Sequence, residues 1–226
     1  RYPCTLTAQD IQRLANRHTG IGFDQCLLVT PSTQPGIDFG YVIYNADGSE
    51  VGQCGNGARC LARFIHHVGL SDAPSFSIAT SHSRMHAHIL DDNQVSITLP
   101  PPQFNTNIIP TTLTPDAAGA YHLPDMPIDH LLYCVNVGNP HAVYFTTEHD
   151  DANIAQLGQY IGQHSAFNEG VNVGCAIIDA PDAMRLRVVE RGVGETNACG
   201  SGAIAAMVLA RRFFQTDADM HISLPG

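Results

Sequence analysis

Two of the seven cysteines in this 226-residue chain lie in matching glycine-rich motifs, each followed by an apolar, helix-favouring stretch. Cys54 opens the sequence CGNGA and Cys199 opens the sequence CGSGA. At a helix start, unpaired N–H groups and the positive end of the helix dipole favour a thiolate over a thiol. The glycines let an anion such as a carboxylate approach the backbone N–H groups closely. Each motif therefore predicts a reactive sulfur beside an anion-binding turn.

A pair of such cysteines suits the inversion of a carbon that bears a hydrogen. If two equivalent domains face each other across a cleft, their helix starts converge and the thiols address one bound molecule from opposite faces. One thiolate then removes a proton while the opposite thiol delivers another, and backbone N–H groups stabilise the carbanion-like transition state. This chemistry requires neither a metal nor an organic cofactor. The sequence contains no lysine, which excludes a pyridoxal Schiff base and a P-loop for these residues.

The elements that must position these cysteines occur twice along the chain. Each copy reads as two strands, a glycine-bearing turn, the cysteine motif and an apolar helix. The first copy places its strands at 22–31 and 39–44 and its helix at 59–68. The second copy places its strands at 170–181 and 184–189 and its helix at 204–214. Residues 204–209 of that helix have almost no polar face, so the helix should be buried.

A strand pair at 86–90 and 95–99 precedes three consecutive prolines at 100–102, which cannot lie inside a sheet. We therefore predict two domains, an N-terminal half at 1–101 and a C-terminal half at 102–226. The predicted fold class is α+β, with two pseudo-symmetric domains, each a mostly antiparallel sheet wrapped around a central apolar helix.

Composition narrows the range of functions. The net charge of −10 argues against a nucleic-acid partner, which requires a basic face. No run of 18 apolar residues and no charged-then-apolar leader is visible, so we expect no membrane span and no signal peptide. An odd number of widely spaced cysteines favours reduced thiols and a cytoplasmic location.

The two motifs and their flanking residues resemble the active-site segments of the diaminopimelate epimerase family. Residues 45–60 (NADGSEVGQCGNGARC) are similar to the first segment and residues 190–203 (ERGVGETNACGSGA) to the second; residues 20–25, 137–141 and 170–174 match further family segments. The resemblance implies an isomerase that interconverts LL- and meso-2,6-diaminoheptanedioate without a cofactor, in lysine and peptidoglycan-precursor synthesis. It also implies a small diamino dicarboxylic acid as substrate and a homodimer.

The resemblance assigns roles residue by residue. Cys54 and Cys199 take the two acid/base positions, and His141 and Glu190 take the positions that orient or tune the thiols. The positions that match substrate contacts are Gln25, Asn45, Asn139, Asn172, Glu190 and Arg191, and the backbones of Gly55, Asn56, Gly200 and Ser201 match those that hold carboxylates. No residue is assigned to a cofactor or a metal.

The sequence departs from the family at both ends. The family begins with a strand that supplies a further substrate asparagine and finishes with additional strands, and neither is found here. We therefore expect a chain truncated at both termini, which binds its substrate poorly because one wall of the site is missing.

Other interpretations of the same residues remain open. The fold could serve a proline or hydroxyproline racemase or a phenazine-biosynthesis-type isomerase, although a racemase would be expected to carry histidine where Asn56 stands. A non-catalytic amino-acid binding protein would show a similar cleft without needing both thiols. The clustered His82, His86 and His88 raise a metal site as a weaker alternative, because no zinc motif is present. Cys60, six residues into the first helix, is expected to serve packing, and Cys4, Cys26, Cys134 and Cys175 are expected to be core thiols or bystanders.

Overall fold

The structure, a computed structural model, describes residues 6–52, 54–92, 94–127, 130–148 and 153–226. The chain divides into two compact units, with the division between Pro100 and Pro101. Cys4 lies outside the described residues. Among the described residues, no helix combines the length and the apolar character needed to cross a bilayer.

The described part of the N-terminal unit contains one sheet and two helices, of which α2 packs on the sheet. Its elements, in chain order, are α1 (Ala8–Ala15), β1 (Gln25–Pro31), β2 (Phe39–Asn45), β3 (Glu50–Val51), α2 (Gly55–His67), β4 (Ser75–Ala79), β5 (Arg84–Ile89) and β6 (Val95–Thr98). The strand order is β1-β2-β4-β5-β6, and β3 pairs with β2. All pairs are antiparallel except β2 with β4.

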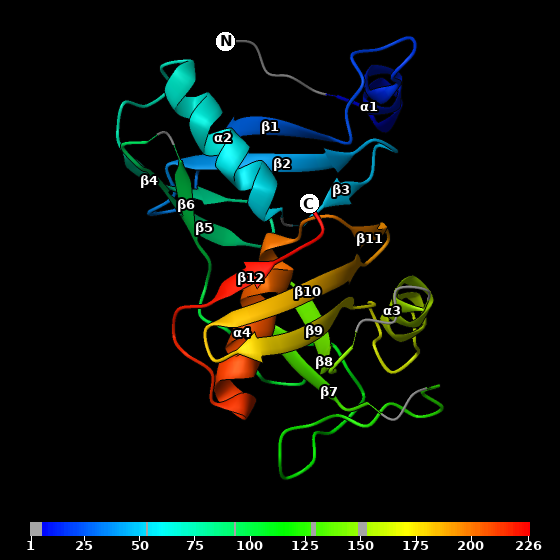
Figure 1. The fold of residues 1–226 in the computed structure, drawn as a ribbon. Helices are drawn as coiled ribbons and strands as arrows, with labels where there is room; N and C mark the ends of the chain where they lie inside the picture. Colours follow the sequence, from blue (N-terminus) through cyan, green and yellow to red (C-terminus); the bar gives the residue numbers. More distant parts are fainter. Residues whose placement is uncertain (1–5, 53, 93, 128–129, 149–152) are drawn as a thin grey trace. The chain divides into compact units, whose positions relative to one another are not determined.

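Helix α2 lies across one face of this sheet (Figure 1). Its buried face carries Ala58, Leu61, Ala62 and Ile65, which pack with Ile43 and Ile78 of the sheet. The other side of the helix is exposed and includes Cys60. The expectation that Cys60 packs inside is therefore wrong, because the helical period turns it away from the buried stripe.

The C-terminal unit is a sheet with a helix on each face. Its elements are β7 (Leu132–Asn136), β8 (Pro140–Phe145), α3 (Ile154–Gly162), β9 (Asn172–Ala180), β10 (Ala183–Glu190), β11 (Gly194–Thr196), α4 (Gly200–Phe214) and β12 (His221–Ser223). The order is β11-β10-β9-β8-β7, with β12 beside β10; the β8–β9 and β10–β12 pairs are parallel and the others antiparallel.

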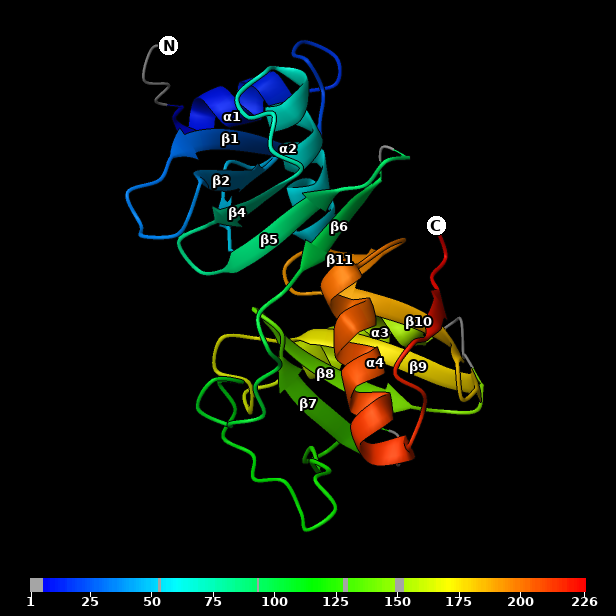
Figure 2. The ribbon, with the colours of Figure 1, turned by 90° about the vertical axis from the view of Figure 1, so that its left-hand side faces the viewer.

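The two helices contact neighbouring residues of the same strand, β10. A Cβ on Gly158 of α3 would meet Val189, whereas a Cβ on Gly202 of α4 would meet Val188. Because neighbouring strand residues point to opposite faces, α3 and α4 cover opposite faces of the sheet. Figure 2 shows α4 running along its face of the sheet. Cys134 and Cys175 lie in the core on the α3 side, as predicted, while Cys26 is only half-buried.

The sequence repeat corresponds to a structural repeat. In each unit the strand before the turn pairs with the short strand after it in the same register relative to the cysteine. Eleven and three residues before Cys54, Ile43 pairs with Val51; at the same offsets from Cys199, Val188 pairs with Thr196. The prediction of two α+β domains with mostly antiparallel sheets is thereby confirmed. The helices begin at the glycine that follows each cysteine, four residues before the predicted apolar stretches.

Candidate active site

Cys54 is the residue that caps the N-terminus of α2. Its backbone is extended (φ −147°, ψ 110°), and its carbonyl accepts the first helical hydrogen bond from the Ala58 N–H at 2.9 Å. The Gly57 N–H donates to the Cys54 sulfur at 3.3 Å. The sulfur therefore occupies the place that a serine or aspartate oxygen takes in an ordinary helix cap.

The two glycines of the first motif have different surroundings. A Cβ on Gly57 would lie 2.9 Å from Leu27 Cδ2 and 3.4 Å from the Cys54 sulfur, so only glycine fits there without displacement. A Cβ on Gly55 would meet no atom within 4 Å. The backbone at Gly55 is therefore open to a ligand, while Gly57 fixes the sulfur against the sheet.

Two predicted substrate residues of this unit lie opposite each other on neighbouring strands. Gln25 of β1 is in register with Asn45 of β2, and the Gln25 side-chain amide donates to Asn45 Oδ1 at 3.2 Å. The Asn45 amide donates to Ser49 Oγ at 3.3 Å across the following turn. Asn56, in the first turn of α2, accepts a hydrogen bond from Arg59. Both Gln25 and Asn45 thus present polar groups at the same end of the sheet.

Cys199 occupies the N-cap position of α4 as Cys54 does in α2, although its side chain makes no capping hydrogen bond. Its backbone is extended (φ −132°, ψ 102°), and its carbonyl accepts from the Ala203 N–H at 3.0 Å. A Cβ on Gly202 would lie 2.9 Å from Val188 Cγ2 and 3.2 Å from the Cys199 sulfur, whereas a Cβ on Gly200 would meet no atom within 4 Å. The open first glycine and the packed second glycine recur in both motifs.

The side chain of His141 joins a buried polar network at the start of α4. His141 is fully buried, and its Nε2 lies 3.1 Å from both Asn139 Oδ1 and Ser201 Oγ. The Asn139 amide donates to Ser201 Oγ at 3.2 Å, and Ser201 Oγ lies 3.7 Å from the Cys199 sulfur. His141, Asn139, Ser201 and Cys199 therefore form one cluster.

His141 is a neutral imidazole in this environment. Burial and the nearby Arg191 guanidinium lower its pKa from 6.5 to about 3. Loss of hydration penalises the imidazolium, and the neighbouring positive charge adds to the penalty. His141 can therefore orient its partners through hydrogen bonds but holds no charge near neutral pH.

Glu190, at the end of β10, is the carboxylate beside Cys199. Its Oε1 accepts a hydrogen bond from the Thr196 hydroxyl at 2.6 Å, and its negative charge acts on the Cys199 thiol. Burial is the largest cause of a rise in the Cys199 pKa from 9.0 to about 11, and the negative charge of Glu190 is the next; the Gly202 amide and the Ser201 hydroxyl act in the opposite direction. The helix start was expected to favour a thiolate at this position. At Cys199 that expectation is wrong, because desolvation outweighs the helix-terminal donors.

The Asn172 side chain is hydrogen-bonded to the backbone of Arg191. Asn172 is buried; its Nδ2 donates to the Pro140 carbonyl at 3.1 Å and its Oδ1 accepts from the Arg191 N–H at 2.9 Å. The Arg191 side chain is exposed and donates to the Glu169 carbonyl at 2.8 Å. Asn172 thus fixes the end of β10, from which Glu190 and Arg191 project.

The structure gathers the predicted residues into two groups, one in each unit. The N-terminal group contains Gln25, Asn45, Cys54, Gly55 and Asn56, and the C-terminal group contains Asn139, His141, Asn172, Glu190, Arg191, Cys199, Gly200 and Ser201. Thr196 was not predicted. The signal that could have identified it is its position in the second motif: it pairs directly with Val188 of β10 and lies three residues before Cys199.

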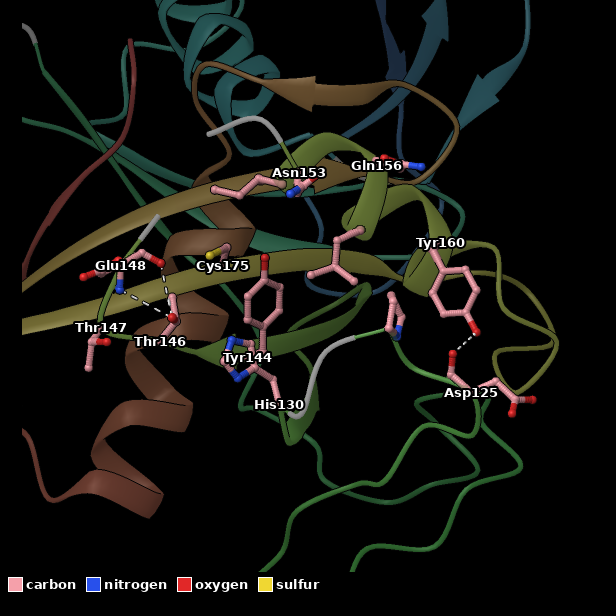
Figure 3. A pocket seen from close by; sticks show the side chains of 13 residues that line it. Asp125, His130, Tyr144, Thr146, Thr147, Glu148, Asn153, Gln156, Tyr160 and Cys175 are labelled. Carbon is pink, nitrogen blue, oxygen red and sulfur yellow. Dashed lines mark hydrogen bonds between the residues drawn. The ribbon is translucent and has the colours of Figure 1, made fainter. Parts of the chain in front are cut away.

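A cavity of about 720 Å³ lies elsewhere in the C-terminal unit (Figure 3). It is lined from the α3 side of the sheet by Cys175 and Tyr144, and the His130 ring stacks on Tyr144 with centroids 5.5 Å apart. Tyr160 borders it and donates to the Asp125 carbonyl at 2.9 Å. None of the predicted site residues lines this cavity.

The histidines considered for a metal site form hydrogen bonds with hydroxyl groups instead. His86 bonds Ser77 and His88 bonds Ser75 across the β4–β5 pair, and His82 bonds Ser81. Within the part of the chain that the structure describes, no group of three metal-ligating side chains comes together.

Comparison with known proteins bears on the identity of the chain. A sequence model described as "Diaminopimelate epimerase" matches residues 4–104 and 133–226. Among the most similar curated relatives, the diaminopimelate epimerase of Legionella pneumophila (strain Corby) is 46% identical over 223 residues, which is 98% of this chain and 80% of the relative. That of strain Lens is 47% identical over 222 residues, with the same coverage of both chains.

Solved structures resemble the chain in fold at low sequence identity. A probable proline racemase from Agrobacterium radiobacter K84 superposes with a TM-score of 0.59 at 17% identity, covering 98% of this chain and 75% of the racemase. A methylitaconate-delta-isomerase gives a TM-score of 0.59 at 16% identity, covering 97% of this chain and 79% of the isomerase. These matches show a shared fold, while the sequence matches show the family. The repeated cysteine motifs, the family match over most of the chain and the 46% identity together place this chain in the diaminopimelate epimerase family.

Proposed function

We propose that the chain is an isomerase that epimerises LL-2,6-diaminoheptanedioate to the meso isomer, in lysine and peptidoglycan-precursor synthesis. The observation that supports this most directly is the pair of cysteines that cap α2 and α4 with the same backbone geometry and the same open glycine beside each sulfur. Two equivalent acid/base groups are what inversion of one stereocentre requires. The family membership of the chain names the substrate.

In the proposed reaction, the carboxylate at the reacting carbon binds the N–H groups at the helix starts, at Gly55 and Asn56 and at Gly200 and Ser201. One cysteine takes the α-proton as a thiolate, and the other gives its thiol proton to the opposite face of the carbanion. Charge that develops on the carboxylate is stabilised by these N–H groups. In this proposal the two cysteines transfer the protons and the helix-start N–H groups stabilise the charge, and no cofactor is included.

The C-terminal cysteine is suited to begin as the acid. Its raised pKa keeps Cys199 protonated near neutral pH, and Glu190 lies where it can accept that proton when a thiolate is needed. In the forward and reverse directions the two cysteines exchange roles. Glu190 therefore serves as the local proton acceptor, and His141 as a neutral group that orients the residues around it.

The remaining polar residues are proposed to recognise the part of the substrate that does not react. A distal amino-acid head requires partners for one ammonium and one carboxylate. Gln25, Asn45, Asn139, Asn172, Glu190 and Arg191 offer amide, carboxylate and guanidinium groups for this purpose. The side-chain bonds that Asn172 makes to Pro140 and Arg191 indicate that its contribution includes fixing the strand end.

Several wider expectations belong to the same proposal. Residues 1–101 and 102–226 would be the two halves of the enzyme, each supplying one cysteine. By family resemblance we propose a homodimer that acts in the cytoplasm on a small molecule, without nucleic acid or membrane as a partner.

The proposal is tested by exchange of the α-proton of the LL substrate for deuterium in heavy water, followed by chiral analysis. The intact chain should incorporate deuterium and form the meso isomer, and Cys54→Ser and Cys199→Ser should each abolish epimerisation. A binding protein would retain the ligand in both variants and exchange nothing. A racemase of the proline type would exchange proline or hydroxyproline instead.

A further inference from the structure

The hydroxyl of Ser201 lies at the centre of the buried network and is within reach of the Cys199 sulfur. We propose that this hydroxyl is a positioning group that donates a hydrogen bond to Cys199 and supports its thiolate, and that Asn139 and His141 hold it in place. The proposal rests on the proposed function of Cys199. It gives the Ser201 side chain a role distinct from the carboxylate binding expected of its backbone.

The direction of the bond follows from the partners of each atom. The Asn139 amide group donates to Ser201 Oγ at 3.2 Å. Asn139 Oδ1 can only accept, so His141 Nε2 at 3.1 Å must carry the hydrogen. That Nε2–H also faces Ser201 Oγ at 3.1 Å. Both acceptor positions of the Ser201 oxygen are thus occupied, and its own proton is left for the sulfur at 3.7 Å.

The buried Nδ1 of His141 agrees with this assignment. Among the described residues it has no hydrogen-bond partner, and an N–H in that position would be costly to bury. The hydrogen therefore belongs on Nε2, where its two acceptors are Asn139 Oδ1 and Ser201 Oγ.

Cys199 then lies between a donor and an acceptor. In the resting state Ser201 donates to the sulfur, and Glu190 is the carboxylate whose negative charge acts on the thiol. When the proton moves from sulfur to a carboxylate oxygen, the negative charge passes to the sulfur, and a hydrogen bond to a charged acceptor is stronger. The Ser201 bond therefore strengthens in the thiolate state.

The first motif lacks this device at the matching position. The residue two places after Cys54 is Asn56, whose oxygen accepts from Arg59. The Cys54 sulfur accepts from the Gly57 amide. The two motifs therefore differ in the side chain two places after the cysteine, a hydroxyl at Ser201 and an amide engaged with Arg59 at Asn56.

The test compares Ser201→Ala, Ser201→Thr and the control Ser165→Ala, an exposed serine of the same unit. Titration of the full chain labelled with ¹³Cβ-cysteine, with the Cys199 signal assigned from Cys199→Ser, gives the ionisation constant directly. We expect Ser201→Ala to lower that constant about tenfold, the size of one lost hydrogen bond to a charged group. Ser201→Thr should restore it, and the control should match the parent chain.

The alkaline limb of the kcat profile should move with the titration. An unchanged Cys199 titration in Ser201→Ala, or a threonine variant that folds without restoring it, would overturn the proposal. Should Ser201→Ala fail to fold, Asn139→Ala removes one of the groups that orient the hydroxyl and must lower the ionisation constant in the same direction. Deuterium exchange by the parent chain is scored separately, so absence of exchange counts against the epimerase function and an unchanged titration counts against the role of Ser201.

Discussion

Replacing Glu190 with glutamine should separate the acidity of Cys199 from the rate of the reaction. Burial supplies the largest part of the rise in the Cys199 pKa from 9.0 to about 11, and the charge of Glu190 supplies the next largest. Two like charges about 4 Å apart repel by roughly 4 kcal/mol at an effective dielectric constant near 20, which is an upper bound. We take the charge of Glu190 to raise the Cys199 pKa by about 1, which corresponds to about 1.4 kcal/mol, or about tenfold in the ionisation constant.

Glu190→Gln should therefore increase the ionisation constant of Cys199 about tenfold. The same change removes the group that accepts the thiol proton, so turnover should fall by about 100-fold or more. The Thr196 hydroxyl can still donate to the glutamine oxygen, so the hairpin should keep its shape. Acidity and turnover thus change in opposite directions.

The assay combines a cysteine ¹³Cβ titration with deuterium exchange at the substrate α-carbon. Glu195→Gln is the matched control, because Glu195 lies in β11 of the same hairpin and pairs with Arg187. It should leave the Cys199 titration unaltered. A Glu190→Gln protein whose Cys199 is no more acidic than that of the parent chain would refute the electrostatic role assigned to Glu190.

Three further outcomes are expected. Gly202→Ala should destabilise the C-terminal unit by about 1–3 kcal/mol, since the new Cβ would lie 2.9 Å from Val188, whereas Gly200→Ala, which meets no atom within 4 Å, should keep the fold and raise KM; denaturant unfolding and kinetics distinguish them. Tyr41→Phe should stabilise the N-terminal unit by about 1 kcal/mol in the same unfolding assay, because the Tyr41 hydroxyl is buried without a hydrogen-bond partner among the described residues. His141 binds no proton in the folded state until about pH 3 but does so near pH 6.5 when unfolded, so its contribution to stability is lost as the pH falls below 6.5. Acidification from pH 7 to pH 5 should therefore destabilise the parent chain by about 2 kcal/mol more than His141→Gln, and equal losses in urea melts would contradict this.

Because the motif is repeated, the order of strand, turn, cysteine and helix in both units could be predicted from the sequence. Because both copies keep the same spacing between strand, turn and cysteine, identifying one pairing fixes the other: Ile43 with Val51, and Val188 with Thr196. The position of the cysteines as helix caps followed from the glycines beside them. These are local properties, which the order of residues along the chain determines.

The electrostatic state of the second thiol could not be predicted in the same way. A helix start predicts a lowered pKa, but Cys199 is only 5% exposed and faces a carboxylate from β10. Its burial depends on how the sheet packs against α4, which no spacing along the chain specifies. The exposure of Cys60 is a different case, because the helical spacing of Ala58, Leu61, Ala62 and Ile65 already places Cys60 outside the buried stripe of α2.

In each unit the sulfur and the amides that would receive a carboxylate belong to the same first turn of one helix. They form one rigid unit, since the second glycine of each motif packs between the sulfur and a strand side chain. Tilting such a helix to admit a bulkier ligand would re-aim the sulfur at the same time. In proteins with this arrangement, we therefore expect substrate range to change through side chains outside that helix turn, such as Gln25 and Arg191, while the turn that carries the sulfur and the amides stays the same.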